Sequence, residues 1–143
     1  MKYILVLCTG NSCRSQMMEV VLKSLLDKRK YKVYSAGLEA HGINPYMKKS
    51  MENLGYSLEG HTSNTMQEYQ HILFDFVITV CDHAQSNCPF FNNATHRIHH
   101  SFTDPANAQG SDSEKMSVYD KVRDEIIIYG QELVDVIQSK SSF

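Results

Sequence analysis

A short apolar run near the amino end of the chain leads directly into a glycine-containing loop and then into an amphipathic segment. The run, Tyr3 to Leu7, lacks the polar alternation of a half-exposed strand, which is typical of a strand buried on both faces in a parallel sheet. From Arg14 to Leu26, apolar residues recur on two adjacent rows of one helical face. This strand–loop–helix unit predicts an α/β fold, in which helices cover a parallel sheet.

The same alternation continues along the chain. We expect further strands at 32–35, 74–80 and 97–102, and helices at 45–54 and 119–137. Gly130 lies inside the last helix and should weaken it by about 1 kcal/mol relative to alanine. The segment 106–113 is expected to be a polar surface loop. We therefore predict a single α/β domain over residues 1–143, with a parallel sheet flanked by helices on both faces.

Composition and charge narrow the class of protein. The net charge of −2 and the pI of about 6.4 argue against a nucleic-acid binder. The apolar run before Thr9 is too short for a secretory signal, and no stretch approaches the roughly 18 apolar residues of a membrane span. We expect a cytoplasmic protein that does not associate with membranes. In that reducing compartment, cysteines are more often catalytic, redox-active or metal-binding than structural.

The loop after the first strand carries the clearest chemical signal. Gly10 permits a positive φ, so successive backbone N–H groups can point inward and merge with the helix N-terminus to bind an oxyanion. Arg14 adds a planar fork of donors, and the same positive field favours the thiolate form of Cys8. Ser15 can donate a hydrogen bond to that thiolate. The oxyanion-binding cradle therefore consists of Cys8, Thr9, Gly10, Asn11, Ser12, Cys13, Arg14 and Ser15.

Two further features fall at the predicted carboxyl edge of the sheet, where sites assemble in open parallel sheets. Asp104, before Pro105, offers a general acid for a departing oxygen. Cys81 ends a predicted strand, and Cys88 follows after six residues. This spacing, even with the nearby histidines, fits no usual zinc signature. We favour a redox pair that works with Cys8.

At these residues the chain resembles a known family, the thioredoxin-coupled arsenate reductases, which share the fold of the low-molecular-weight tyrosine phosphatases. The resemblance implies a four-stranded parallel sheet, with the cradle as the phosphate-binding loop. It runs almost end to end and includes Gln16-Met17 after the cradle, Tyr34-Ser35-Ala36-Gly37, His41-Gly42-x-Asn44-Pro45, Gly60-His61-Thr62-Ser63, Thr79-Val80-Cys81, Cys88-Pro89, Asp104-Pro105 and Val122-Arg123-Asp124-Glu125.

The resemblance also implies a mechanism. Cys8 would attack the arsenic of arsenate while Arg14 and the loop amides neutralise the oxyanion, and Asp104 would protonate the leaving oxygen. Cys81 would attack the sulfur of the Cys8–arsenic adduct, releasing arsenite and leaving a Cys8–Cys81 disulfide. Cys88 would convert it to a Cys81–Cys88 disulfide that thioredoxin reduces. A helix across 81–88 would separate these two cysteines by about 10 Å, whereas a disulfide needs Cα atoms within about 7 Å, so the segment must change conformation.

Some members of this family carry a potassium ion beside the cradle. Asn11, Glu19, Ser35 and Thr62 match that site, but Asn64 replaces the usual aspartate. The resemblance implies no tightly bound cofactor other than this ion. It implies thioredoxin as the protein partner, phosphate or sulfate as competing oxyanions, and a monomer.

Two other functions remain open. A low-molecular-weight tyrosine phosphatase would use the same Cys8, Arg14 and Asp104, but such phosphatases usually have proline where this chain has Gln16 and an aromatic residue where it has Ala106. A phosphatase would also give the cysteine pair no role. A non-enzymatic oxyanion-binding redox sensor would use the cradle and the thiols but not Asp104.

Overall fold

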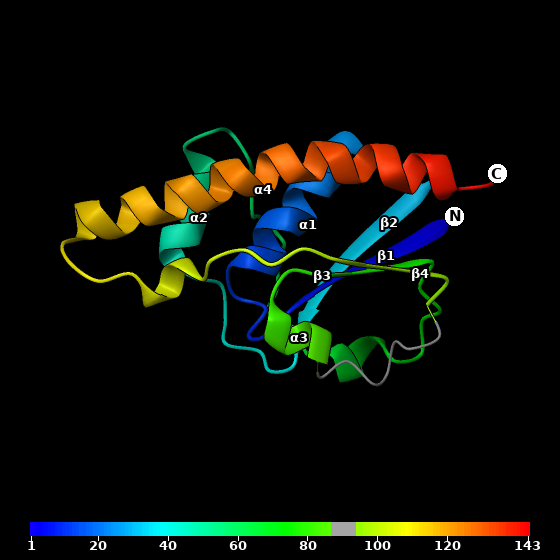
Figure 1. Cartoon of the computed structure of the whole chain (residues 1–143), viewed down its shortest axis with the longest axis horizontal. Helices are drawn as coiled ribbons and strands as arrows, with labels where there is room; N and C mark the ends of the chain where they lie inside the picture. Colours follow the sequence, from blue (N-terminus) through cyan, green and yellow to red (C-terminus); the bar gives the residue numbers. More distant parts are fainter. Residues whose placement is uncertain (87–93) are drawn as a thin grey trace.

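The computed structural model of the protein describes residues 1–86 and 94–143. Its sheet has the strand order β2-β1-β3-β4, with every pairing parallel. This confirms the predicted single α/β domain with a four-stranded parallel sheet (Figure 1). In chain order the elements are β1 (Lys2–Cys8), α1 (Arg14–Leu25), β2 (Tyr31–Gly37), α2 (Pro45–Glu52), the 3-10 helix η1 (Met66–Tyr69), β3 (Phe76–Thr79), α3 (Asp82–Ser86), β4 (His96–His99), the 3-10 helix η3 (Pro105–Asn107) and α4 (Asp112–Lys140).

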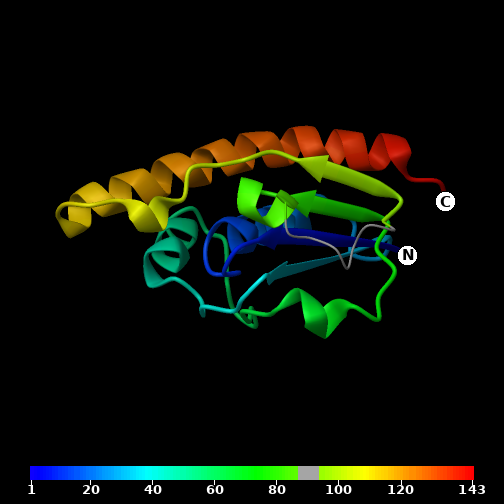
Figure 2. The ribbon, with the colours of Figure 1, turned by 60° about the horizontal axis from the view of Figure 1, so that its bottom comes forward.

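The two central strands explain the apolar run at the amino end. Residues 4–8 of β1 and all four residues of β3 are buried, as expected for strands that are covered on both faces. On one side of the sheet, α1 packs on β1 and β2 and against α4. The short helix α3 contacts β1 and β3 (Figures 1 and 2). Both chain termini lie at the end of the sheet where β1 begins, so the carboxyl ends of β1 and β3 meet at the other end (Figure 1).

The last helix begins seven residues earlier than the apolar pattern predicts. Ser111 caps its first turn by accepting from the Glu114 amide, and the Glu114 carboxylate accepts from the Ser111 amide in return. The expected loop at 106–113 is therefore wrong at both ends, because Asp112 and Ser113 are helical and η3 spans Pro105–Asn107. The early turns of α4 carry too few apolar residues to be recognised by periodicity alone.

Gly130 has a packing role that helix propensity does not reveal. It is buried in α4 where that helix meets α1, and a Cβ atom there would lie 2.7 Å from Cγ1 of Val21. The missing side chain allows the two helices to approach closely. The propensity cost that we expected at this position therefore accompanies a contact that alanine would disturb.

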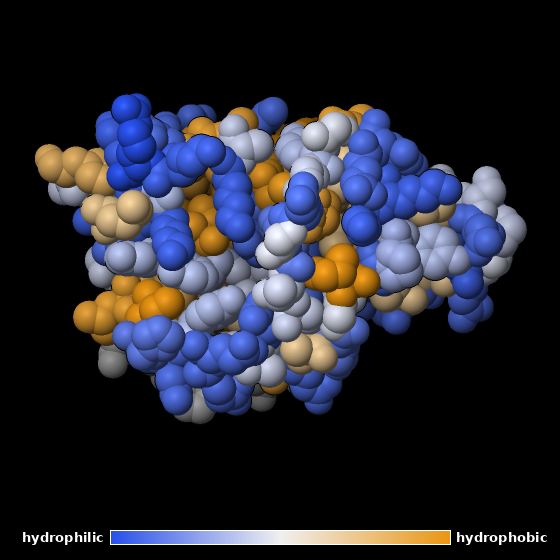
Figure 3. Space-filling view, turned by 180° about the vertical axis from the view of Figure 1, so that it is seen from behind, coloured by the Kyte–Doolittle hydropathy of each residue, from blue (hydrophilic) through white to orange (hydrophobic). Residues whose placement is uncertain are grey.

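The surface is largely polar on the side opposite to the view of Figure 1, and its hydrophobic residues form separate clusters there (Figure 3). Within residues 1–86 and 94–143, no helix combines the length and the apolar character that crossing a membrane requires.

Candidate active site

The cradle is held from its outer side by the segment that follows β2. The backbone carbonyls of Cys8, Thr9, Gly10 and Ser12 accept hydrogen bonds from the amides of Leu38, Glu39, His41 and Asn44, at 2.9–3.3 Å. These bonds turn the carbonyl groups of the loop outward. Among the described residues, no backbone carbonyl accepts from the amides of residues 10–14. The cradle therefore has the polarity of an oxyanion site, with N–H groups available to a bound anion.

The left-handed backbone conformation in the cradle is adopted by Asn11, with a φ of 45°, and not by Gly10 as the sequence predicts. Asparagine tolerates this region better than most residues do. Gly10 is needed for a different reason, because a Cβ atom there would lie 2.3 Å from Nδ1 of His41. The glycine thus lets the imidazole ring pack on the loop.

A hollow of about 160 Å³ opens over the cradle. That space is well above the roughly 15 Å³ that one water molecule needs, so a small oxyanion can enter. The residues around it come from the cradle, the segment after β2 and the segment after β4: Cys8, Thr9, Gly10, Ser12, Cys13, Arg14, His41, Asp104 and Ala106.

The Cys8 sulfur lies at the base of this hollow and is almost fully buried. It is 2.8 Å from Oγ of Ser15, and the same hydroxyl oxygen accepts a hydrogen bond of 2.8 Å from Nδ2 of Asn11. The Ser15 hydroxyl therefore bonds both the Asn11 side chain and the Cys8 sulfur. Because a thiolate can only accept, this hydroxyl is placed to donate to Cys8 when the sulfur acts as a nucleophile.

Arg14 and Asp104 also line the hollow and lie next to each other. One guanidinium nitrogen of Arg14 donates to the carbonyl of Phe102 at 3.0 Å, and the other is 3.5 Å from a carboxylate oxygen of Asp104. The second carboxylate oxygen accepts from the Ala106 amide at 3.0 Å. Sequence reasoning placed Cys8, Arg14 and Asp104 in one site, and the structure brings all three to the same hollow.

Cys13 also lines the hollow, but its environment favours the neutral thiol. Burial raises the pKa of its thiol, and the nearby negative charges of Asp104 and Cys8 raise this pKa further. Cys13 is therefore a neutral thiol at physiological pH, unlike a reactive thiolate.

A further buried thiol lies at the edge of the cradle. The Cys81 sulfur is 3.4 Å from Oγ1 of Thr9, and the Ala84 amide of α3 points to the same sulfur at 3.4 Å. The side chain of Cys81 is 4% exposed. Cys88, its expected partner, lies outside the described residues.

Comparison with known proteins agrees with this geometry. Residues 3–141 match the model of the low molecular weight phosphotyrosine protein phosphatases. The chain belongs to that family. Among curated relatives, it is 46% identical to an arsenate reductase of Halalkalibacterium halodurans and 45% identical to one of Bacillus subtilis, in each case over 87% of this chain and 89% of the relative. A solved arsenate reductase in a phosphate-binding state superposes with a TM-score of 0.80 at 28% identity, covering 96% of this chain and 99% of that one.

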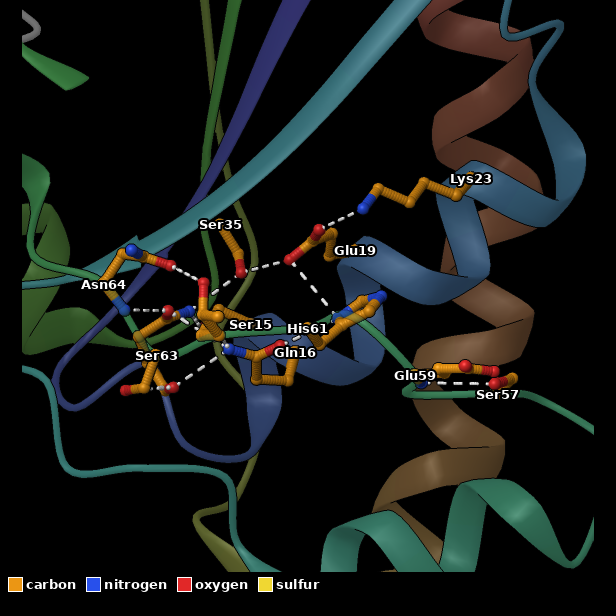
Figure 4. Close-up of polar contacts among 12 residues, drawn as sticks. Ser15, Gln16, Glu19, Lys23, Ser35, Ser57, Glu59, His61, Ser63 and Asn64 are labelled. Atoms are coloured by element: carbon orange, nitrogen blue, oxygen red, sulfur yellow. Dashed lines mark hydrogen bonds and ion pairs between the residues drawn. The ribbon is translucent and has the colours of Figure 1, made fainter. Parts of the chain in front are cut away.

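The residues that match the potassium site of some arsenate reductases are connected by hydrogen bonds next to the cradle, and Figure 4 shows Glu19, Ser35 and Asn64 near Ser15. Their polar atoms are already paired. Oδ1 of Asn11 accepts from the Asn64 amide at 2.8 Å, and the Ser35 hydroxyl donates to Glu19. The Thr62 hydroxyl donates to the Asn64 side chain at 2.7 Å, and the Lys23 ammonium forms an ion pair with Glu19. A lysine thus already supplies positive charge to this carboxylate. In this arrangement these residues bond to one another, and potassium binding stays a prediction.

His61 completes this network. Its Nδ1 lies 3.0 Å from Oε1 of Gln16, whose amide nitrogen donates to Oδ1 of Asn11 at 3.1 Å. Burial lowers the pKa of His61, and the Lys23 charge lowers it further, against an opposing effect of Glu19. The network connects α1, β2 and the segment 60–64 to the cradle, and it holds the Asn11 side chain from both ends.

Sequence reasoning gave no role to one residue that lines the hollow, His41. Nε2 of His41 lies 2.6 Å from a carboxylate oxygen of Glu39. The run His41-Gly42 was noted only as part of the family resemblance. Its position after a strand that pairs with β1 is the signal that would have placed it at the carboxyl edge of the sheet.

Proposed function

We propose that this protein reduces arsenate to arsenite with electrons that come from its own cysteines and are restored by thioredoxin. The curated relatives named as arsenate reductases support the substrate. The observation that carries the proposal is the buried thiol of Cys81 at the edge of the cradle. It lies 3.4 Å from the Thr9 hydroxyl, and hydrolysis of a phosphate ester would give it no role.

The first step forms a sulfur–arsenic bond. The Cys8 thiolate attacks the arsenic atom, the cradle amides and Arg14 neutralise the oxyanion charge, and Asp104 donates a proton to the oxygen that leaves as water. The Ser15 hydroxyl, 2.8 Å from the sulfur, is placed to donate a hydrogen bond to it before the attack. Arsenic stays pentavalent at this stage.

The second step transfers two electrons. The thiolate of Cys81 attacks the Cys8 sulfur, a disulfide forms, and the electron pair of the broken sulfur–arsenic bond stays on arsenic, which leaves as arsenite. Cys88 then attacks Cys81 and releases Cys8 as a thiolate. Thioredoxin reduces the resulting Cys81–Cys88 disulfide and is itself oxidised to a disulfide.

The decisive experiment compares two reactions in the same variants. We expect arsenite release with thioredoxin, thioredoxin reductase and NADPH in the wild-type protein, and none after Cys8→Ser. Cys81→Ser and Cys88→Ser should stop multiple turnover but retain hydrolysis of phenyl phosphate, which needs only the cradle and the acid. If both reactions fell together in folded Cys81 and Cys88 variants, the relay would be wrong. Replacing thioredoxin by glutathione and glutaredoxin tests the reductant.

Phosphate-ester hydrolysis is the second candidate, as a side activity of the same site. Cys8, Arg14 and Asp104 surround one hollow, which is the equipment that a cysteine-dependent phosphatase needs. A redox sensor without catalysis would not need a carboxyl group such as Asp104 beside Arg14. The cytoplasmic location and the monomeric state stay predictions, the second of which sedimentation analysis would test.

A further inference from the structure

A chain of side-chain contacts ties the start of α3 to the sheet. Nε2 of His99 lies 2.8 Å from a carboxylate oxygen of Asp82, and Nδ1 of the same imidazole lies 2.7 Å from Oγ1 of Thr79. Thr79 and His99 are direct partners in the pairing of β3 with β4, and the Thr79 side chain is buried. The imidazole is therefore fixed on the sheet at one nitrogen and pairs with α3 at the other.

The position of Asp82 makes this contact relevant to the redox chemistry. Asp82 directly follows Cys81 and is the first residue of α3, a helix of five residues. Among the described residues, the amides of Ala84 and Gln85 form local bonds, to the sulfur and the carbonyl of Cys81. A short helix of this kind gains little stability from its own hydrogen bonds. The contact between Asp82 and His99 links α3 to β4.

The proposed relay makes two opposite demands on Cys81. In the reduced state its thiol must stay at the edge of the cradle, ready for the adduct on Cys8. Afterwards the wound segment that follows it must open, because seven helical steps would hold Cys81 about 10 Å from Cys88. A contact that stabilises the wound form but is weak enough to break would meet both demands.

We propose that Asp82 and His99 form a latch that positions Cys81, with Thr79 holding the imidazole in place. This inference rests on the proposed relay. The closed latch keeps α3 wound and the Cys81 thiol buried beside Thr9. When the latch opens, α3 unwinds and Cys81 becomes free to form its second disulfide. Asp82 and His99 are positioning residues, since neither lines the hollow over Cys8.

The first test measures access to Cys81 in the reduced protein. Iodoacetamide labelling is followed by mass spectrometry of the Cys81 peptide for wild type, Asp82→Ala, His99→Ala and the double variant. A partly exposed side-chain contact has modest strength, so we expect each single change to speed labelling about threefold to tenfold. The double variant should be no faster than the faster single one, because one contact is lost in all three. Unchanged labelling in both single variants, or rates that multiply in the double variant, would overturn the latch.

Two controls keep this test specific. Hydrogen exchange at the amides of Ala84 and Gln85 should become faster in the same variants in which labelling becomes faster. Unlike labelling, this exchange does not depend on the ionisation of the thiol. Asp27→Ala removes an exposed ion pair with Arg29 in the turn between α1 and β2, and it should leave both readouts unchanged. Phenyl phosphate hydrolysis should stay within twofold of wild type in every variant, which reports a folded cradle. If the alanine variants do not fold, Asp82→Asn takes their place.

A second measurement separates failure of the latch from failure of the relay. Loss of the latch destabilises the reduced form, so the reduction potential of the Cys81–Cys88 disulfide should become more negative. The threefold to tenfold change corresponds to about 14–30 mV. An unchanged potential together with unchanged labelling would refute the latch alone. If the wild type formed no such disulfide, the relay would be wrong, and the labelling would still decide the latch.

Discussion

Asn11 offers the sharpest test of how the cradle is held. Its side chain is completely buried and takes part in four hydrogen bonds. Nδ2 donates to Ser15 and Ser35, and Oδ1 accepts from Gln16 and the Asn64 amide. Its backbone also adopts the left-handed conformation. Asn11→Gly removes the side-chain bonds but keeps the backbone freedom, whereas Asn11→Ala removes both.

The size of the two effects follows from these contacts. Each buried hydrogen bond contributes about 1 kcal/mol, so Asn11→Gly should lower the free energy of unfolding by about 4 kcal/mol. Alanine in the left-handed region costs about 1–2 kcal/mol and regains about 0.5 kcal/mol in the unfolded chain, so Asn11→Ala should be about 1 kcal/mol less stable than Asn11→Gly. Because Ser15 loses the donor that orients it toward Cys8, kcat for phenyl phosphate should fall about a hundredfold in both variants.

Urea unfolding followed by circular dichroism, together with the hydrolysis assay, measures both quantities. Asn53→Ala is the matched control, because Asn53 is exposed at the end of α2, and its loss should change stability by no more than about 0.5 kcal/mol. A loss below about 1 kcal/mol for Asn11→Gly would refute the reasoning about the buried network. Equal stability of the glycine and alanine variants would refute the role assigned to the positive φ.

Three further predictions concern other parts of the fold. Gly130→Ala should destabilise the protein by about 1 kcal/mol in urea unfolding, because overpacking against Val21 exceeds the gain in helix propensity, and Val21→Ala should cost less in the Gly130→Ala background than in the wild type. Since the pKa of His61 is lowered by folding, the unfolded chain binds protons more readily below about pH 6.5, so the melting temperature should fall from pH 7 to pH 5.5 and fall less in His61→Gln. Since burial raises the pKa of Cys13, alkylation followed by peptide mass spectrometry at pH 8 should modify Cys8 well before Cys13, and equal rates would contradict this assignment.

The sequence predicted the parts of the fold that depend on periodicity and on parallel topology. The apolar run of β1, the helix from Arg14 and the meeting of Cys8, Cys81 and Asp104 at one edge all follow from patterns within a few residues. Local capping chemistry was missed. The Ser111–Glu114 capping box extends α4 through a polar stretch in which hydrophobic spacing carries no signal.

Other features depend on contacts that a single sequence does not encode in any short pattern. The left-handed residue was assigned to Gly10 because glycine is the default for positive φ, but buried bonds on both ends of the Asn11 side chain fix the turn one residue later. The close approach of Gly130 to Val21 joins residues that are far apart in the chain. Contacts of this kind arise only when the helices are in place.

The adjacency of β1 and β3 makes it easier for a site that hydrolyses esters to acquire redox chemistry. Because the two strands are direct neighbours, their carboxyl ends stay one strand spacing apart, about 4.8 Å, whatever the surrounding helices do. A thiol added at the end of β3 therefore arrives beside a nucleophile that already handles tetrahedral oxyanions. A scaffold that hydrolyses esters is thus separated by few mutations from one that transfers electrons, since the sheet already brings the ends of these two strands together. For the same reason, we expect that grafting such a cysteine, with a resolving partner, onto a hydrolase of this architecture would begin to confer reduction without rebuilding the pocket.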